Sequence, residues 1–133
     1  MGKVTQYDAN DCVVTINEWY VTGLGEDFIT GERQENFFEP AVGAQGDIVE
    51  NEVNNDLGTI TLSIQATSPQ KGELLKMAKA GEHFSIWVTN KNIGERFGGT
   101  DARIVNFPEL EFGAEIAERE FEITVFDYTV DAI

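Results

Sequence analysis

"TITLSIQAT", residues 59–67, is the stretch that decides the fold. Ile60, Leu62, Ile64 and Ala66 alternate along it with threonine, serine and glutamine side chains. Because successive side chains of a β-strand point to opposite faces, this period of two predicts a strand with one buried face. The other face is polar but carries no charge. We therefore expect a half-buried strand near the middle of a mainly β protein.

The residues directly after this stretch predict one short helix, over about residues 69–80. Ser68 is a suitable N-cap, Pro69 fits the first helical position, and Gly81 can end the helix. Apolar side chains recur on one face, at Leu74, Leu75 and Ala78. The lysines are expected on the outer face of the helix, at Lys71, Lys76 and Lys79.

Shorter β-rich runs flank these two elements. We expect a hairpin across Asn17-Glu18, which joins residues 13–16 to residues 19–22. Further strands are expected over residues 27–33, 84–88, 102–107 and 121–130. The chain is therefore predicted to be one domain, residues 1–133, folded as an antiparallel β-barrel or sandwich with one flanking helix.

The ends and the cysteine content of the chain suggest an ordinary soluble protein. No apolar run approaches the roughly 20 residues that span a bilayer, and the first residues lack the apolar region of a signal peptide. Cys12 is the single cysteine, so the chain cannot form an internal disulfide, which suits a reducing cytosol. We expect a protein made without export and without a membrane anchor.

Charge is the most unusual bulk property. The chain has 24 acidic and 9 basic residues, for a net charge of −15. Residues 34–70 contain acids and no base, and Arg119 is the one base from residue 104 to the end. Such a surface repels nucleic acid and anionic lipid. A sequence-specific DNA or RNA binder and an anchor on an anionic membrane are therefore disfavoured.

The most acidic segment, "GAQGDIVENEVNNDLG" at residues 43–58, does not have the spacing of a metal loop. A calcium loop places oxygen ligands at alternate positions and a glycine at the sixth, yet counting from Asp47 gives Val49 third and Glu52 sixth. Zinc sites need more soft ligands than His83 and Cys12 provide. We expect no metal and no cofactor here.

Patterns of known catalytic sites are also missing. No serine lies in a G-x-S-x-G elbow, and no glycine-rich loop has the spacing of a phosphate-binding loop. Carboxylate pairs of the glycosidase kind arise by chance in so acidic a chain. The sequence therefore predicts a protein that is not an enzyme. An acidic β-domain that binds calcium or carbohydrate stays as a lesser alternative.

A projecting arm is predicted at about residues 34–47. This stretch is long for a hairpin loop, and long loops in compact domains are usually functional or disordered. It carries apolar side chains that a disordered loop would lack, at Phe37, Phe38, Pro40 and Val42. Other large aromatics, such as Phe107 and Phe112, lie in segments that look irregular. These either seal the ends of the barrel or contact a partner.

The segment "VGAQGDIVENEVNNDLGTITLSIQATSP", residues 42–69, together with the helix and strand after it, resembles tail tube proteins of tailed bacteriophages. It is most similar to the small tube subunits of contractile tails. The shared features are a glycine-rich "VGAQGD" turn, an "NN-D-x-G" turn, and an alternating threonine-rich strand that ends in "TSP" at the helix start. The resemblance covers about residues 12–90, and the last third matches mainly as strands of suitable length.

The resemblance implies a structural protein of the virion tail that is assembled in the host cytoplasm. Members of the family form a β-barrel or sandwich with a flanking helix, close as hexameric rings, and stack into a tube through which double-stranded DNA passes without specific binding. The implied partners are further copies of the chain and the tail sheath, baseplate and tape-measure proteins. A tube of a phage-derived bacteriocin or secretion system is the alternative.

The resemblance also assigns roles to residues. The arm residues Phe37, Phe38, Pro40 and Val42 would stack one ring on the next. If residues 48–53 form a strand, Glu50 and Glu52 share one face and would point into an acidic lumen, where they keep DNA off the wall. The alternative is that they lie outside and aid solubility. The lysines Lys71, Lys76 and Lys79 would face outward, where a sheath could contact them.

Overall fold

The computed structural model describes residues 6–133, except the side chains of residues 25–27. Residues 1–5, which make up most of the region expected to lack a signal peptide, lie outside this part. The elements are a 3-10 turn Ala9–Asp11 and, in chain order, β1 Cys12–Ile16, β2 Trp19–Tyr20, β3 Leu24–Arg33, β4 Phe38–Val42, β5 Ile48–Glu52, β6 Gly58–Ile64, α1 Lys71–Ala80, β7 Phe84–Asn90, β8 Glu95–Ile104, β9 Arg119–Val125 and β10 Thr129–Ala132. No helix in the described part is long and apolar enough to cross a membrane.

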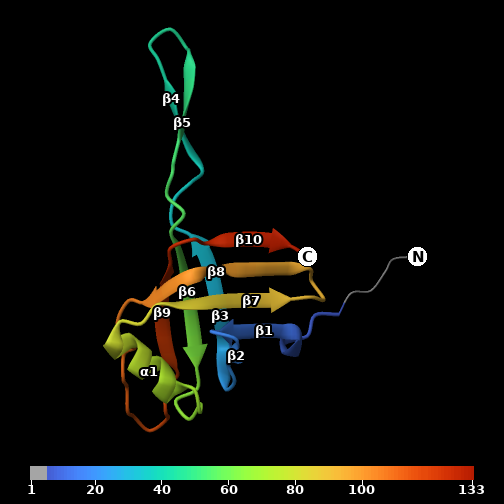
Figure 1. The fold of residues 1–133 in the computed structure, drawn as a ribbon, viewed down its shortest axis with the longest axis vertical. Coiled ribbons are helices and arrows are strands. Elements are labelled where there is room, and N and C mark those ends of the chain that lie inside the picture. Colours follow the sequence, from blue (N-terminus) through green and yellow to red (C-terminus); the bar gives the residue numbers. More distant parts are fainter. Residues whose placement is uncertain (1–5) are drawn as a thin grey trace, which may run out of the picture.

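One antiparallel sheet of eight strands forms the body, in the order β2-β1-β7-β8-β9-β6-β3, with β10 added on β8. Strand β8 belongs to two layers. Its first half pairs with β7 and β10, and residues 102–104 pair with β9. Figure 1 shows β1, β7, β8 and β10 running nearly at right angles to β3, β6 and β9. The sheet therefore folds over on itself as an orthogonal sandwich, and not as a closed barrel.

The core lies between these two layers and confirms the prediction from residues 59–67. Ile60, Leu62 and Ile64 of β6 are fully buried. The same holds for the inward residues of the neighbouring strand β9, Phe121, Ile123 and Val125. Leu62 lies directly opposite Phe121 in the β6–β9 ladder, so two apolar rows face the other layer together.

The predicted β1–β2 hairpin is also confirmed, although its turn has no glycine. Asn17 and Glu18 both have left-handed backbones, with φ of 47° and 72°. Two left-handed residues make the type of turn whose twist matches that of the paired strands, and asparagine tolerates this conformation better than most residues. The backbone N–H of Ser85 donates to the Asn17 side chain at 3.1 Å, which fixes the turn against β7.

The helix begins two residues later than predicted, at Lys71, and Ser68 is not its N-cap. Gln70 occupies the capping position without a side-chain hydrogen bond to the helix. Ser68 is buried, and its hydroxyl donates to the Thr22 carbonyl at 2.8 Å. A long-range bond to the loop after β2 therefore takes the hydroxyl that local sequence assigned to capping, and Pro69 lies before the helix.

The other end of the helix follows the prediction, because Gly81 ends it with φ of 67°. Leu74 and Met77 form the buried face. Leu75 and Ala78 are half-buried and pack against the edge of the core. The predicted apolar stripe is therefore rotated toward Met77.

Several predicted strands have different bounds. Strand β3 begins at Leu24 instead of residue 27, and β6 ends at Ile64 instead of residue 67. Strand β8 starts at Glu95 and ends at Ile104, whereas residues 102–107 were expected. Its early part contains Gly98, which has φ of 141° and lies so close to β7 that a Cβ would overlap the Ile86 carbonyl. Only glycine fits there. In the sequence, Gly98 suggests a loop, but in the structure it lies within β8 and allows β8 to approach β7 closely.

The predicted strand over residues 121–130 is divided into β9 and β10 by a turn at Asp127. The Asp127 carboxylate accepts hydrogen bonds from the backbone N–H groups of Thr100 and Asp101, each at 3.0 Å, and from the Thr100 hydroxyl. Partial burial opposes ionisation, but these hydrogen bonds lower the pKa of Asp127 below its ordinary value. The carboxylate thus redirects the chain so that β10 can pair with β8.

Candidate assembly surfaces

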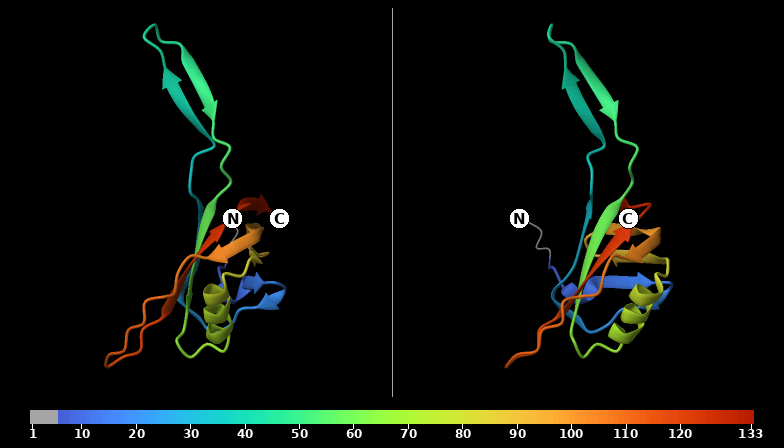
Figure 2. Two further views of the ribbon diagram at one scale, coloured as in Figure 1. Left: turned by 60° about the vertical axis from the view of Figure 1, so that its left-hand side comes forward. Right: turned by 90° about the vertical axis from the view of Figure 1, so that its left-hand side faces the viewer.

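Strands β4 and β5 form a ribbon that stands away from the body. They pair only with each other, and both figures of the whole fold show them rising far beyond the sheet (Figures 1 and 2). Gly43 and Asp47 close the tip through a 2.7 Å backbone hydrogen bond. We call residues 34–57 the arm. It is longer than the predicted 34–47 because the acidic segment supplies its returning strand.

The arm exposes apolar side chains on both strands. Val42 and Ile48 near the tip are 70% and 72% exposed. Other exposed apolar residues of the arm are Phe37, Phe38 and Val49. A two-stranded ribbon alone is marginally stable in water, and apolar groups gathered on a projection are typical of a binding surface.

Pairing in the arm places two predicted sites on one face. Phe38 lies opposite Glu52, and Pro40 lies opposite Glu50. Directly opposite residues of an antiparallel pair point to the same side. Val42 also lies on this face, beside Ile48. Phe38, Pro40 and Val42, which were expected to stack rings, therefore share a face with Glu50 and Glu52, which were expected to line a lumen. A partner that contacts the first group on this face also contacts the two glutamates.

The base of the arm is held by Arg33. Its guanidinium is 3.0 Å from the Asp56 carboxylate and lies over the Phe37 ring, 4.6 Å from the ring centre. The Gln34 backbone N–H donates to the Leu57 carbonyl at 3.0 Å. Phe37 thus lies at the base of the arm and outside the β4–β5 ladder, apart from the other three predicted stacking residues.

The second candidate surface is polar and lies on the outer face of β3, β6 and β9. The uncharged hydroxyl row of β6, at Thr59, Thr61 and Ser63, runs along its middle. Glutamates flank that row on the adjacent strands, because Glu32 pairs with Thr59, Glu122 with Thr61 and Glu120 with Ser63. We call this surface the acidic sheet face. Alternation of Glu120 and Glu122 with Phe121 and Ile123 was a signal for it, but strand order cannot be read from one sequence.

A third surface is the β8–β9 loop, residues 105–118, at the end of the molecule away from the arm (Figure 2). It exposes five large apolar side chains: Val105, Phe107, Leu110, Phe112 and Ile116. Arg119 is 2% exposed and holds the loop, since its guanidinium donates to the Ala117 carbonyl at 2.9 Å. It also lies 5.3 Å from the centre of the Phe112 ring. The aromatics left open by the sequence therefore face outward here.

The three helix lysines differ in their surroundings. The Lys71 ammonium donates to the Ala66 carbonyl at 2.6 Å and is half-buried. Lys76 is exposed and lies 3.8 Å from Glu73, an exposed pair that contributes little to stability. Lys79 is exposed. Two of the three lysines thus present their charge to the solvent.

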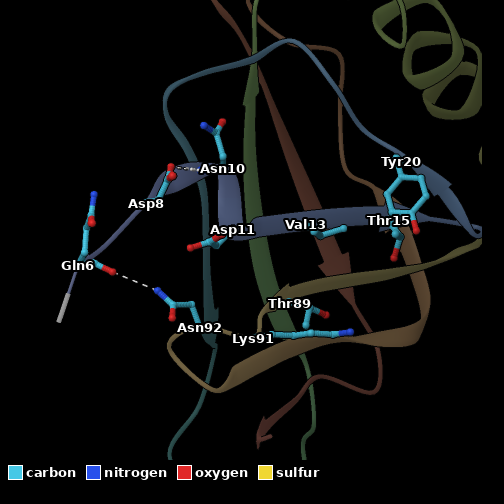
Figure 3. A pocket seen from close by; sticks show the side chains of 10 residues that line it. All are labelled: Gln6, Asp8, Asn10, Asp11, Val13, Thr15, Tyr20, Thr89, Lys91 and Asn92. Carbon is cyan, nitrogen blue, oxygen red and sulfur yellow. Dashed lines mark hydrogen bonds between the residues drawn. The ribbon is translucent and has the colours of Figure 1, made fainter.

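A wide, open hollow of about 1230 Å³ lies on the outer face of β1, β2 and β7 (Figure 3). Figure 3 shows polar side chains spread around its rim, with Tyr20 at one end and Asp8 near the other. Its lining contains no histidine, cysteine or serine, the side chains that most often act as a catalytic base or nucleophile.

The two soft-ligand candidates lie in separate places. His83 Nδ1 is 2.6 Å from the Asp101 carboxylate, and the imidazole stacks on Phe126. Cys12 is half-buried in β1, and burial raises the pKa of its thiol. No three histidine, cysteine or acidic side chains gather into a metal-binding group within the described part of the chain.

Solved structures of contractile particles are similar to this chain over nearly its whole length. The anti-feeding prophage cap, a tube-terminating cap, matches with a TM-score of 0.68 and 15% identity over 100% of this chain and 97% of that one. The chain therefore has the same fold as this cap. A chain of the PVC sheath-tube complex of an extracellular contractile injection system, in the extended state, has a TM-score of 0.72 and 14% identity over 96% of this chain and 93% of that one.

The sheath/tube terminator of the same injection system has a TM-score of 0.62 and 15% identity, covering 98% of this chain and all of that one. The predicted mainly β, tail tube-like fold is therefore confirmed. No protein-family model and no curated protein matches the sequence. At identities of 14% and 15%, these structural similarities show the fold alone.

Proposed function

We propose that this chain is a structural subunit of the tube of a phage-type contractile particle, in which six copies close a ring and rings stack around an acidic channel. The observation that carries this proposal is the arm, which presents apolar side chains that its own chain does not cover. The neighbours named above come from a tube cap, a sheath-tube complex and a terminator, which supports the same role.

Ring closure uses the open edges of the sandwich. In the described part, β3 pairs with β6 alone and β10 pairs with β8 alone, so each leaves one edge of backbone groups unpaired. Unpaired edges invite pairing with another chain, and head-to-tail contacts that close form a ring. The apolar β8–β9 loop adds a further surface for a neighbour in the same ring.

The acidic sheet face lines the channel in this proposal. Its carboxylates, from Glu32, Glu120 and Glu122, repel the phosphates of DNA, and its hydroxyl row binds water without holding an anion. The sequence-based assignment places Glu50 and Glu52 in the channel, which requires the arm to turn its Phe38 face inward. Transport along such a wall needs no catalysis, in keeping with a non-enzymatic protein.

A terminating cap is the second candidate, because two of the three structures named above end a tube. A cap forms a ring that binds one end of a tube and adds no further ring. Two of the matches also belong to an extracellular injection system, so the particle is either such a system or a phage tail.

Electron microscopy of the purified full chain tests the proposal. We expect rings with a central hole, and at higher concentration stacks of rings. Single rings that do not stack would favour the cap. Particles that stay monomeric at all concentrations, also in the presence of preformed tube ends, would contradict both candidates.

A further inference from the structure

The outer face of α1 has an unusual composition for this chain. Leu74 and Met77 point into the core, which leaves Gly72, Lys76 and Lys79 on the opposite side of the helix. Leu75 is half-buried beside them. In a chain with a net charge of −15, this face combines two exposed lysines with part of an apolar side chain. The exposed Glu73 at its edge lies 3.8 Å from Lys76 and offsets only one of the two positive charges. It is the natural complement of a surface that is acidic and apolar.

Gly72 on this face has no role inside the molecule. A Cβ built on it would meet no atom of the chain within 4 Å, and its backbone is that of an ordinary helix. Glycine destabilises a helix relative to alanine, so its own fold gives no reason for this residue. A missing side chain does allow another backbone to approach the helix closely.

The arm has the complementary surface. Its ribbon carries acidic side chains and no base, with Glu50 and Glu52 on the face that also holds Val42 and Ile48. The arm and α1 lie toward opposite ends of the long axis of the molecule, so the arm cannot reach its own helix (Figures 1 and 2). Only a different copy can bring the two surfaces together.

We propose that the arm of one copy docks on the outer face of α1 of a second copy in the next ring, with Glu50 and Glu52 facing Lys76 and Lys79. This contact replaces the sequence-based placement of Glu50 and Glu52 in the channel and leaves the acidic sheet face to line it. This inference rests on the proposed function, because it needs rings that stack. A contact between unlike patches at opposite ends of a molecule repeats without closing, which is how a stack of rings grows. Apolar contact by Val42 and Ile48 on Leu75 supplies the buried area, and the charges set the register.

Charge exchange in the full chain tests the docking. Glu50→Lys with Glu52→Lys, and separately Lys76→Glu with Lys79→Glu, should each abolish stacking while single rings still form. The chain that combines all four changes should stack again. The acid-to-lysine variant controls for general repulsion, because it moves the net charge toward zero and would otherwise favour association. Stacking is measured by sedimentation and electron microscopy, and circular dichroism checks that each variant folds.

Two further measurements locate the contact. Carbodiimide cross-linking of mixed nitrogen-15 and unlabelled protein should join Glu50 or Glu52 of one copy to Lys76 or Lys79 of another. Gly72→Ala should raise the midpoint of thermal unfolding of the single subunit yet weaken stacking.

The outcomes separate the docking from the proposed function. Rings that stack equally in all the variants, rings of the unaltered chain that never stack, or cross-links from Lys76 and Lys79 to another region would overturn the docking and leave the ring-forming function standing. Absence of rings in every sample would overturn both.

Discussion

The β6–β9 pair and the β4–β5 pair of the arm have the same backbone pairing but differ in how far their side chains are buried. Both are antiparallel ladders, and β6 of the first directly follows β5 of the second in the chain. Every second residue of β6 is buried, whereas all residues of β4 and β5 are exposed. Backbone pairing is therefore the same in the two, and burial of side chains makes the difference. The first ladder stabilises the subunit. The second exposes side chains that other parts of its own chain do not cover.

The largest expected effect is in the core. Phe121→Ala removes a fully buried ring between the two layers and should lower the free energy of unfolding by about 3–5 kcal/mol. Urea unfolding of the single subunit measures this. Val42→Ala, at an exposed site of the arm, is the control and should change it by less than about 0.5 kcal/mol. Equal effects at the two sites would remove the contrast drawn between the ladders.

Two left-handed glycines give the next comparison. Gly98→Ala should lower the free energy of unfolding by about 3 kcal/mol, because it adds both backbone strain and overlap of the new Cβ with β7. Gly46→Ala at the tip of the arm has a φ of 87° but open space around it, so strain alone should cost about 1 kcal/mol. Thermal unfolding of both variants measures the difference. A cost at Gly46 as large as at Gly98 would count against the close β7–β8 contact.

A smaller effect is expected at the turn between β9 and β10. Asp127→Asn weakens the hydrogen bonds that hold Thr100 and Asp101, which should cost about 1 kcal/mol after allowance for solvent. The pKa of Asp127 is lowered in the folded state, so its contribution is full above the unfolded pKa. It is lost as the pH falls through the folded value.

Unfolding measured from pH 7 down to about pH 2 tests this, because the ordinary pKa of an aspartate is about 3.9. The difference in free energy of unfolding between the unaltered chain and Asp127→Asn should become smaller as the pH falls. Val42→Ala on the arm is the control, and its free energy of unfolding should stay equal to that of the unaltered chain at each pH. A constant gap at every pH would mean that the carboxylate charge has no part in the turn.

The smallest effect on the subunit is expected in the arm. Val42→Ser with Ile48→Ser should leave the free energy of unfolding within about 0.5 kcal/mol, because both side chains are already exposed. Stacking of rings should nevertheless be lost, as seen by sedimentation. Thr61→Val on the acidic sheet face is the control and should leave stacking intact. Stacking by the double-serine variant would show that the arm is not needed for it.

The sequence was informative where the pattern was local. The alternation at residues 59–67 and the helix stop at Gly81 both depend on neighbours in the chain, and both were found. The N-cap was wrong because Ser68 bonds to Thr22, 46 residues away. The strand at Gly98 was missed because its reason is the Ile86 carbonyl of another strand.

The assembly surfaces follow the same rule. Apolar residues in an irregular stretch predicted an arm, yet only the register of β4 on β5 shows that Pro40 and Glu50 share a face. The acidic sheet face depends on β6 lying between β3 and β9, an order that one sequence does not contain. The position of the β8–β9 loop depends on the buried Arg119, the one base between residue 104 and the C-terminus.

Strand β8 gives the body a mechanical character of its own. Because one strand is hydrogen-bonded into both layers, sliding one layer over the other requires breaking ladder bonds as well as apolar contacts. The arm is joined to the body by two chain segments, by the Arg33 cluster, and by hydrogen bonds from the Tyr128 backbone N–H to the Asp56 carbonyl and from the Gln34 side chain to the Thr59 hydroxyl, each at 3.0 Å. In a stack of such subunits under axial load, each sandwich body would keep its shape. The deformation would occur in the arms that connect one body to the next.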